Sequence, residues 1–168
     1  HLTKAGWADV MLGGRLRKIV AHPTKQGWVY VFDRATGEPI WPIEERPVEQ
    51  STVPGERSSA TQRFVMKPPP FDRQGVGEDD LIDFTPGLRA EAVKHVARFK
   101  LGPIFTPPVV STWAGPLATL MLPNATGGAN WQGGSLDPET GVLYIFSNTQ
   151  VSGLGPGPGA GPSRMGHA

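Results

Sequence analysis

The sequence predicts an all-β fold with a long proline-rich excursion and one short helix. Apolar runs of strand length recur toward both ends of the 168-residue chain, and turn signals separate them. The chain holds 22 glycines and 18 prolines, about twice the average usage, which favours many turns over a helical bundle. Cysteine is absent, which excludes disulfides, thiolate metal sites and thiol nucleophiles. The formal net charge of +1 indicates neither a nucleic-acid binder nor a strongly acidic partner.

The first strands lie in residues 7–41, which predict up to four short antiparallel strands, about one blade of a β-propeller or a comparable meander. Residues 7–12 and 16–21 are apolar runs on either side of a Gly-Gly turn. Residues 28–32 alternate aromatic side chains with valine, so both faces are apolar, as expected of a central strand. Residues 38–41 indicate the returning strand.

A turn of the form Asp-x-x-Thr-Gly follows the third strand at Asp33. The aspartate carboxylate can accept backbone N–H groups across such a turn, and Gly37 can take the left-handed conformation that other residues resist. The same turn recurs at Asp137, before an apolar run at 142–147 that we expect to be a strand. The recurrence indicates a shared turn device and is weak evidence for a repeat.

The middle of the chain, residues 42–103, predicts a proline-rich insert. Its first part, to residue 70, lacks periodicity, and we interpret the Lys-Pro-Pro-Pro-Phe run at 67–71 as a rigid spacer rather than a partner motif. A helix is expected at about 86–99, with Thr85 as its N-cap and proline at its first position. The acidic residues between 78 and 83 lack the spacing of a calcium loop, and we expect a solvated face there.

The last third of the chain predicts strands again. Short apolar runs at 104–106 and 117–122 are bounded by prolines, and a glycine-rich run follows at 127–134. That run does not open a helix and lacks a following Lys-Ser/Thr, which argues against a phosphate loop. Residues 151–168 are rich in glycine and proline, and we expect a disordered tail.

Few residues are candidates for chemistry. The sequence has no nucleophile elbow, and its four histidines lack metal-ligand spacing. Lys25 on one loop and Asn130 with Trp131 on another remain. Taken alone, Lys25 is more simply a solvated charge, Asn130 a turn residue and Trp131 a core residue.

The segments Lys67-Pro-Pro-Pro-Phe71, Glu78-Asp-Asp-Leu81 and Phe105-Thr-Pro-Pro108 resemble the insert of the glucose-dehydrogenase-like branch of the pyrroloquinoline quinone (PQQ)-dependent dehydrogenases. Three further motifs resemble that family as a whole. These are the segment from Thr24 to Val48, which contains Asp33-x-x-Thr36-Gly37-x-x-x-Trp41; the segment Gly127-Gly-Ala-Asn-Trp131; and the segment from Asp137 to Tyr144. The resemblance covers residues from about 12 to 148. It implies a fragment of an eight-bladed β-propeller of roughly two blades, with a blade at 1–41, the insert at 42–103 and part of the next blade at 104–150.

The resemblance also implies roles for particular residues. A lysine at the position of Lys25 contacts the quinone oxygens of PQQ in that family, where an ammonium group stabilises developing negative charge. Asn130 would donate its amide to the cofactor, and Trp131 would form an aromatic wall of the pocket. Blades would dock through the tryptophan-docking motif, whose residues here are Asp33, Thr36, Gly37 and Trp41.

The family's catalytic base is an aspartate in a His-Asp-x-Trp-Asp-like segment upstream of the lysine. Nothing before residue 22 matches that segment, and Asp9 lacks its context, so no catalytic residue is assigned within this chain. The ligands of the family's calcium ion belong to earlier blades and are expected outside the chain as well. The resemblance thus implies one wall of a cofactor pocket without base or metal.

The function expected from the resemblance is part of a periplasmic dehydrogenase. The parent would oxidise a sugar, polyol or other alcohol with PQQ and calcium and pass electrons to a quinone or cytochrome, whereas this chain alone is expected to be inactive. Two alternatives stay open: a non-catalytic propeller module used as an interaction scaffold, and an inactive truncated product. A scaffold would have no reason to retain Lys25 together with Asn130 and Trp131.

Overall fold

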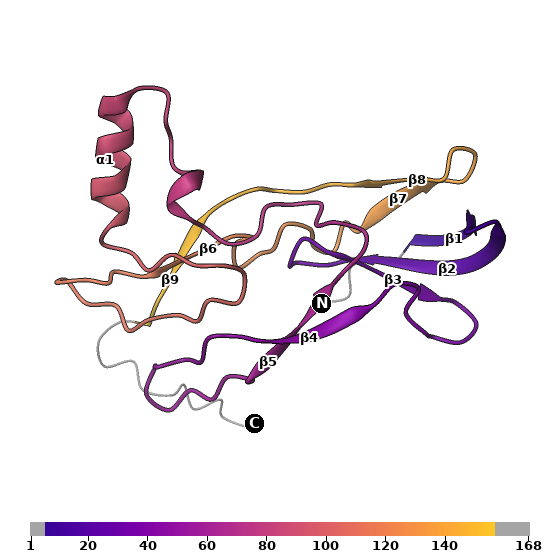
Figure 1. Ribbon diagram of the computed structural model, residues 1–168, viewed down its shortest axis with the longest axis horizontal. Coiled ribbons are helices and arrows are strands. Elements are labelled where there is room, and N and C mark those ends of the chain that lie inside the picture. Colours follow the sequence, from indigo (N-terminus) through magenta and orange to yellow (C-terminus); the bar gives the residue numbers. More distant parts are fainter. Residues whose placement is uncertain (1–5, 157–168) are drawn as a thin grey trace. The chain divides into compact units, whose positions relative to one another are not determined.

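The computed structural model describes residues 6–156, which form two compact units (Figure 1). The described parts of unit 1 are residues 6–46, 63–74 and 122–150. Unit 2 comprises 47–62, 75–121 and the described residues that follow 150. Each unit is therefore assembled from segments that are distant in the sequence. Among the described residues, no helix is both long and apolar enough to span a bilayer.

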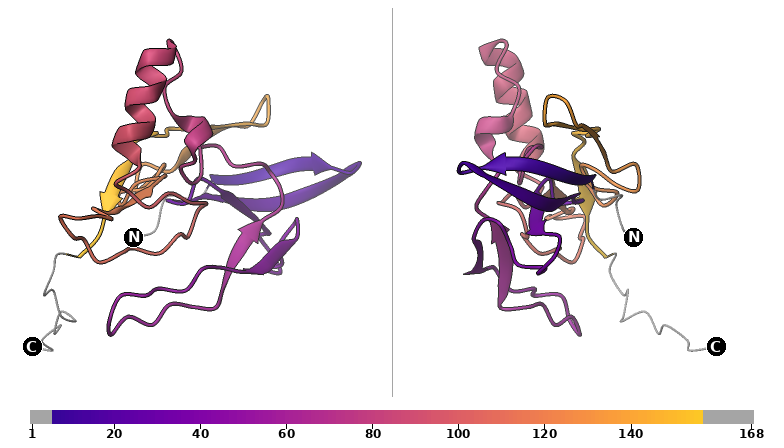
Figure 2. Two further views of the ribbon diagram at one scale, coloured as in Figure 1. Left: turned by 60° about the vertical axis from the view of Figure 1, so that its left-hand side comes forward. Right: turned by 90° about the vertical axis from the view of Figure 1, so that its right-hand side faces the viewer.

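Unit 1 contains a three-stranded antiparallel sheet in the order β1-β2-β3. Its strands are β1 (Gly6–Leu12), β2 (Arg15–Pro23) and β3 (Val29–Asp33). The predicted Gly-Gly turn joins β1 to β2, and both glycines have positive φ, 59° and 74°. Figure 2 shows the twist of this hairpin from two further sides.

The expectation that the third strand is central is wrong, because β2 holds the central position of the sheet. The expected returning strand at 38–41 is also shorter than predicted. Only an isolated bridge joins Phe32 to Pro39, with one further hydrogen bond of 2.9 Å from the Ile40 N–H to the Val31 carbonyl. Pro39 cannot donate a backbone hydrogen bond, which limits the ladder at this edge.

A second hairpin of unit 1 consists of β7 (Gly134–Asp137) and β8 (Val142–Ile145). The Asp137 turn joins the two strands, as the sequence predicts, and β7 lies beside β1 (Figure 1). The core of unit 1 lies on one face of the β1-β2-β3 sheet, where Ala8, Ile19 and Val31 are buried. Buried side chains thus alternate with more exposed ones along the strands, as in an antiparallel sheet that covers a core with one face.

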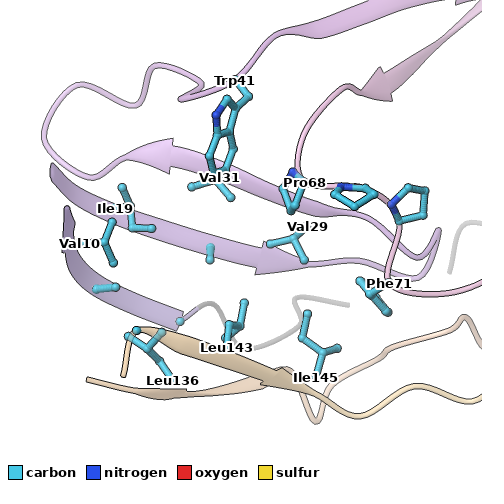
Figure 3. Close-up of a pocket in the computed structure, with 16 residues that line it drawn as sticks. Val10, Ile19, Val29, Val31, Trp41, Pro68, Phe71, Leu136, Leu143 and Ile145 are labelled. Carbon is cyan, nitrogen blue, oxygen red and sulfur yellow. The ribbon is translucent and has the colours of Figure 1, made fainter. Parts of the chain in front are cut away.

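A hollow of about 400 Å³ separates this sheet face from the β7–β8 hairpin (Figure 3). Trp41 stands at one side of it near Val31, while Leu143 and Ile145 project from β8 on the opposite side. Pro68, Pro69, Pro70 and Phe71 also line the hollow. The proline run, which the sequence indicated as a rigid spacer, thus forms one side of this hollow, with Pro68 and Phe71 half-buried and Pro69 and Pro70 exposed.

β4 (Ile43–Pro47) and β5 (Thr61–Val65) pair as a two-stranded sheet in the first part of the proline-rich segment, for which the sequence predicted no regular structure. The charged side chains of β4 concealed its strand character. Arg46 pairs with Glu44 at 2.8 Å and lies 5.1 Å from the Phe64 ring, so its guanidinium is used within the structure.

Unit 2 contains a 3₁₀ helix η1 (Glu78–Asp80), helix α1 (Pro86–Val96) and a sheet of β6 (Thr119–Met121) and β9 (Ser152–Leu154). The Thr85 hydroxyl caps α1 by accepting the Leu88 N–H at 3.2 Å. The helix was expected to reach residue 99, but after Val96 the chain makes tighter i to i−3 bonds at Arg98 and Phe99.

Two other expectations for unit 2 are wrong. Residues 104–106 do not form a strand but a turn, in which Phe105 has a φ of 70°. The segment 151–168 was expected to be disordered throughout, yet Ser152–Leu154 forms β9 and pairs with β6. The remainder of that expectation, from residue 157, lies outside the described residues.

Candidate functional site

Lys25 lies in a closed turn of residues 24–28, which we call the Lys25 turn. The N–H and the hydroxyl of Thr24 both donate to the Trp28 carbonyl, at 2.8 and 3.0 Å, and the Gly27 N–H donates to the Thr24 carbonyl at 3.1 Å. Gly27 has a φ of 84°, which favours glycine. Trp28 is a core residue, as predicted: it is 3% exposed and meets Phe64 edge to face.

Asn130 and Trp131 lie in a loop of residues 124–133, which we call the Asn130 loop. Buried Asn124 organises its beginning, since its side-chain oxygen accepts the N–H groups of Thr126 and Gly127 at 2.9 and 3.1 Å. The Asn130 amide donates to the Thr126 carbonyl at 3.0 Å, and its oxygen accepts the Trp131 N–H at 3.0 Å. Asn130 therefore shapes its own loop.

The Lys25 turn and the Asn130 loop are in direct contact. The Gly128 N–H donates to the Lys25 carbonyl at 3.0 Å. Gly127 packs so closely that a Cβ atom there would lie 2.5 Å from both Cβ and Cγ of Lys25. The structure thus brings together the two predicted site segments, which are about a hundred residues apart in the sequence, and the glycine pair permits the approach.

A third segment, which sequence reasoning missed, joins this contact at Asp72. The Phe71 N–H donates to the Gly27 carbonyl at 2.8 Å, and the Gln74 amide donates to the Gln26 carbonyl at 2.7 Å. The Asp72 carboxylate accepts the hydroxyls of Ser147 and Thr149, the latter at 2.6 Å. No local pattern marks Asp72 in the sequence, because both hydroxyl donors are more than 70 residues away.

The environment of Asp72 favours its ionised form. Partial burial raises the pKa of the carboxyl, but the hydroxyls of Ser147 and Thr149, together with the N–H and the charge of Arg73, outweigh burial, so the pKa lies below its ordinary value. The Arg73 N–H also donates to this carboxylate, at 2.8 Å. Asp72 is therefore an anion held by hydroxyl and backbone donors.

The three predicted cofactor residues present polar and aromatic groups to solvent. Lys25 is exposed, and its ammonium has no hydrogen bond or ion pair within residues 6–156. Trp131 is 68% exposed, so the interpretation of this side chain as a core residue is wrong. Asn130 uses one amide N–H in its loop, and an amide carries two. Together these groups offer a cation, a neutral donor and an indole face.

The predicted docking residues form a turn with the expected bonds. The Asp33 carboxylate accepts the N–H groups of Ala35 and Thr36 at 2.9 and 3.1 Å, and these backbone bonds lower the pKa of its carboxyl. Gly37 has a φ of 77°, and Trp41 packs half-buried against the core of unit 1. Asp137 repeats the turn, accepting the Glu139 N–H and the Thr140 hydroxyl at 3.0 and 2.7 Å.

No group of three or more histidine or acidic side chains with the proximity of metal ligands occurs in the part of the chain that the structure describes. All three acidic residues of η1 are exposed, and the Asp80 carboxylate accepts the Gly77 N–H at 2.7 Å. The candidate site centres instead on Lys25 and on Gly127 and Gly128, which contact it.

Short antiparallel strands joined by tight turns are compatible with a β-propeller domain, and comparison with known proteins identifies that class. Residues 3–155 match the family described as "PQQ: Glucose/ethanol/alcohol dehydrogenase, beta-propeller domain". The chain belongs to this family of PQQ-dependent dehydrogenases, which confirms the resemblance.

Curated relatives share the chain's sequence over most of its length. A quinate/shikimate dehydrogenase (quinone) of Acinetobacter baylyi is 30% identical over 144 residues, 86% of this chain and 17% of the relative. The glycerol dehydrogenase large subunit of Gluconobacter thailandicus is 33% identical over 128 residues, 75% of this chain and 16% of the relative. The quinoprotein glucose dehydrogenase of Escherichia coli is 31% identical over 157 residues, 90% and 19% respectively.

The chain therefore spans less than a fifth of the length of each of these relatives. No solved structure matched it.

Proposed function

We propose that this chain carries one wall of the cofactor pocket of a PQQ-dependent dehydrogenase that oxidises a sugar, polyol or other alcohol. The observation that carries the proposal is the contact of the Lys25 backbone and side-chain stem with Gly127 and Gly128, in the loop that carries Asn130 and Trp131, while the exposed Lys25 ammonium has no partner among the described residues. Membership of the PQQ family supports it. The relatives named for quinate, glycerol and glucose differ in substrate, so we leave the particular alcohol open.

The donor set fits an anionic quinone cofactor. PQQ supplies, when bound, an ortho-quinone that accepts the electrons of the alcohol. Lys25 would bind and stabilise negative charge on its oxygens, because an ammonium group acts most strongly where water is excluded. Asn130 would orient the cofactor through its second amide N–H, and Trp131 would cover an aromatic face and exclude water.

The wider architecture that we propose is an eight-bladed propeller, of which this chain supplies roughly two blades. The segment 42–103 would be an insert between blades at 1–41 and 104–150, and Trp41 with the Asp33 turn would dock neighbouring blades. We further propose that the catalytic base and calcium ligands lie outside this chain, that electrons pass to a quinone or cytochrome, and that the parent acts in the periplasm. Family membership and the motif at 33–41 support these proposals.

Cofactor binding by the chain tests the role of Lys25. We expect PQQ to bind in equilibrium dialysis, and Lys25→Ala to weaken binding about tenfold, the effect of losing one charge-assisted hydrogen bond. Lys18→Ala, at an exposed position of β2, removes the same charge and should change binding less than twofold. Equal losses of affinity in the two variants would mean that Lys25 contributes only its net charge. If the wild type did not bind PQQ, the proposal would be contradicted.

Activity tests the placement of the base. With PQQ and calcium added, we expect no dye-linked oxidation of glucose by this chain, because no aspartate here has the context of the family's base. Turnover comparable to that of a complete dehydrogenase would show that the base is present after all. The same assay on the Lys25→Ala variant would then report whether the lysine contributes.

A further inference from the structure

Asp72 is the point at which three distant segments of unit 1 meet. Its carboxylate accepts the hydroxyls of Ser147 and Thr149, which follow β8, and both partners lie at least 75 residues away in the sequence. The Asn148 N–H, between those two donors, donates to the Gly128 carbonyl at 2.8 Å. The segment after β8 is therefore tied both to Asp72 and to the Asn130 loop.

Asp72 also lies directly against the glycines of both cofactor segments. A Cβ atom at Gly27, in the Lys25 turn, would lie 3.3 Å from the Asp72 Cβ. A Cβ atom at Gly128, in the Asn130 loop, would lie 2.6 Å from Oδ2 of Asp72. Neither position leaves room for a side chain without a shift, so the two loops close around this carboxylate.

We propose that Asp72 is a positioning residue that holds the Lys25 turn and the Asn130 loop in register for the cofactor. The inference rests on the proposed function in that the ligand it serves is PQQ. A single carboxylate fixes both loops, because its hydrogen bonds fasten the segment after β8 while its body fills the space between the two glycines.

Asp72 acts through these contacts and not on the substrate. Oδ1 accepts the Thr149 hydroxyl and the Arg73 N–H, and Oδ2 accepts the Ser147 hydroxyl. Both oxygens are thus engaged by the protein. The lowered pKa keeps the group ionised, which suits an acceptor of three donors better than a base that takes up a proton.

Amide hydrogen exchange in the absence of cofactor tests whether Asp72 holds the two loops together. In Asp72→Asn, amide exchange in residues 24–28 and in 127–131 should accelerate together, each about tenfold, because local opening of both loops becomes easier. The matched control is Asp137→Asn, which also removes a carboxylate that accepts a threonine hydroxyl, and it should accelerate exchange only around its own turn. Unchanged exchange in either loop of Asp72→Asn would overturn the inference.

A second variant keeps the test informative if Asp72→Asn fails to fold. Ser147→Ala combined with Thr149→Val keeps the carboxylate and removes its two hydroxyl donors. It should reproduce the joint acceleration in both loops, with far-ultraviolet circular dichroism unchanged. If amide exchange accelerated only in the residues next to 147 and 149, the proposed positioning role of Asp72 would also be contradicted.

PQQ dialysis distinguishes the inference from the proposed function. Asp72→Asn should weaken binding about fivefold to tenfold, and Lys25→Ala with Asp72→Asn should weaken it by less than the product of the two single effects, because Asp72 acts in part through the lysine. Additive losses would contradict the positioning role. If the wild type does not bind PQQ, the proposed function fails, and the exchange result alone decides whether Asp72 clamps the loops.

Discussion

Asp72 and Asp137 both accept a threonine hydroxyl in unit 1, at 2.6 and 2.7 Å, yet they connect the chain over very different lengths. The partner of Asp137 is three residues away, within one turn of a hairpin. The partner of Asp72 is 77 residues away and belongs to another segment of the unit. One carboxylate shapes a turn, and the other sets how three segments meet.

The difference indicates which substitutions should disturb the arrangement of the segments around Lys25. The bonds of the Asp137 turn stay within that turn, whereas the contact of Asp72 with Gly27 and Gly128 reaches both the Lys25 turn and the Asn130 loop. We therefore expect substitutions near Asp72 to affect stability and cofactor binding together, and matched substitutions near Asp137 to affect stability alone.

The largest effect is expected at Gly127. Gly127→Ala must place a methyl group 2.5 Å from the Lys25 stem at a φ of 92°, which combines roughly 1–2 kcal/mol of left-handed strain with roughly 1–3 kcal/mol of overpacking. Gly141→Ala is the matched control, because its φ is 70° and nothing lies within 4 Å of the new methyl. Urea unfolding should show a clear excess loss for Gly127→Ala, and equal losses would refute the close contact.

A smaller effect is expected from removing the carboxylates. Asp72→Ala should lower the free energy of unfolding by roughly 1–2 kcal/mol, since charge-assisted hydrogen bonds are lost but solvent screens part of the effect. Asp137→Ala removes bonds within one exposed turn and should cost less. Chemical denaturation of both variants measures the comparison, and a larger loss for Asp137→Ala would reverse it.

The smallest effect concerns pH. The folded-state pKa of Asp72 lies below its unfolded value, so the unfolded chain binds more protons as the pH falls. The stability that Asp72 adds is therefore present above about pH 4, the ordinary aspartate range, and is lost as the pH falls through the lower folded-state pKa. The stability difference between wild type and Asp72→Asn should shrink over that interval, and a constant difference would contradict the assignment.

Sequence reasoning succeeded where the physics is local. The Asp33 and Asp137 turns, the Gly-Gly hairpin and the Thr85 cap depend on residues within a few positions of one another, and all are observed. The family came from motif resemblance and is confirmed. The role of Lys25 came from the same resemblance and stays a prediction.

Sequence reasoning failed where partners are distant. The packing of the proline run and the role of Asp72 depend on segments that only the fold brings together. β4 was missed because its charged side chains hide the usual strand alternation. Residue type alone favoured a core position for Trp131, which its 68% exposure contradicts, whereas its role as a wall of the cofactor pocket stays a prediction.

The hollow beside Trp41 leaves room in unit 1 for larger side chains. Its lining is mostly apolar, and side chains that border a space no protein atom fills make fewer dispersion contacts than those of a close-packed core. A modest enlargement of Ala8 or Ala21, both of which line the hollow, should therefore add contacts rather than strain.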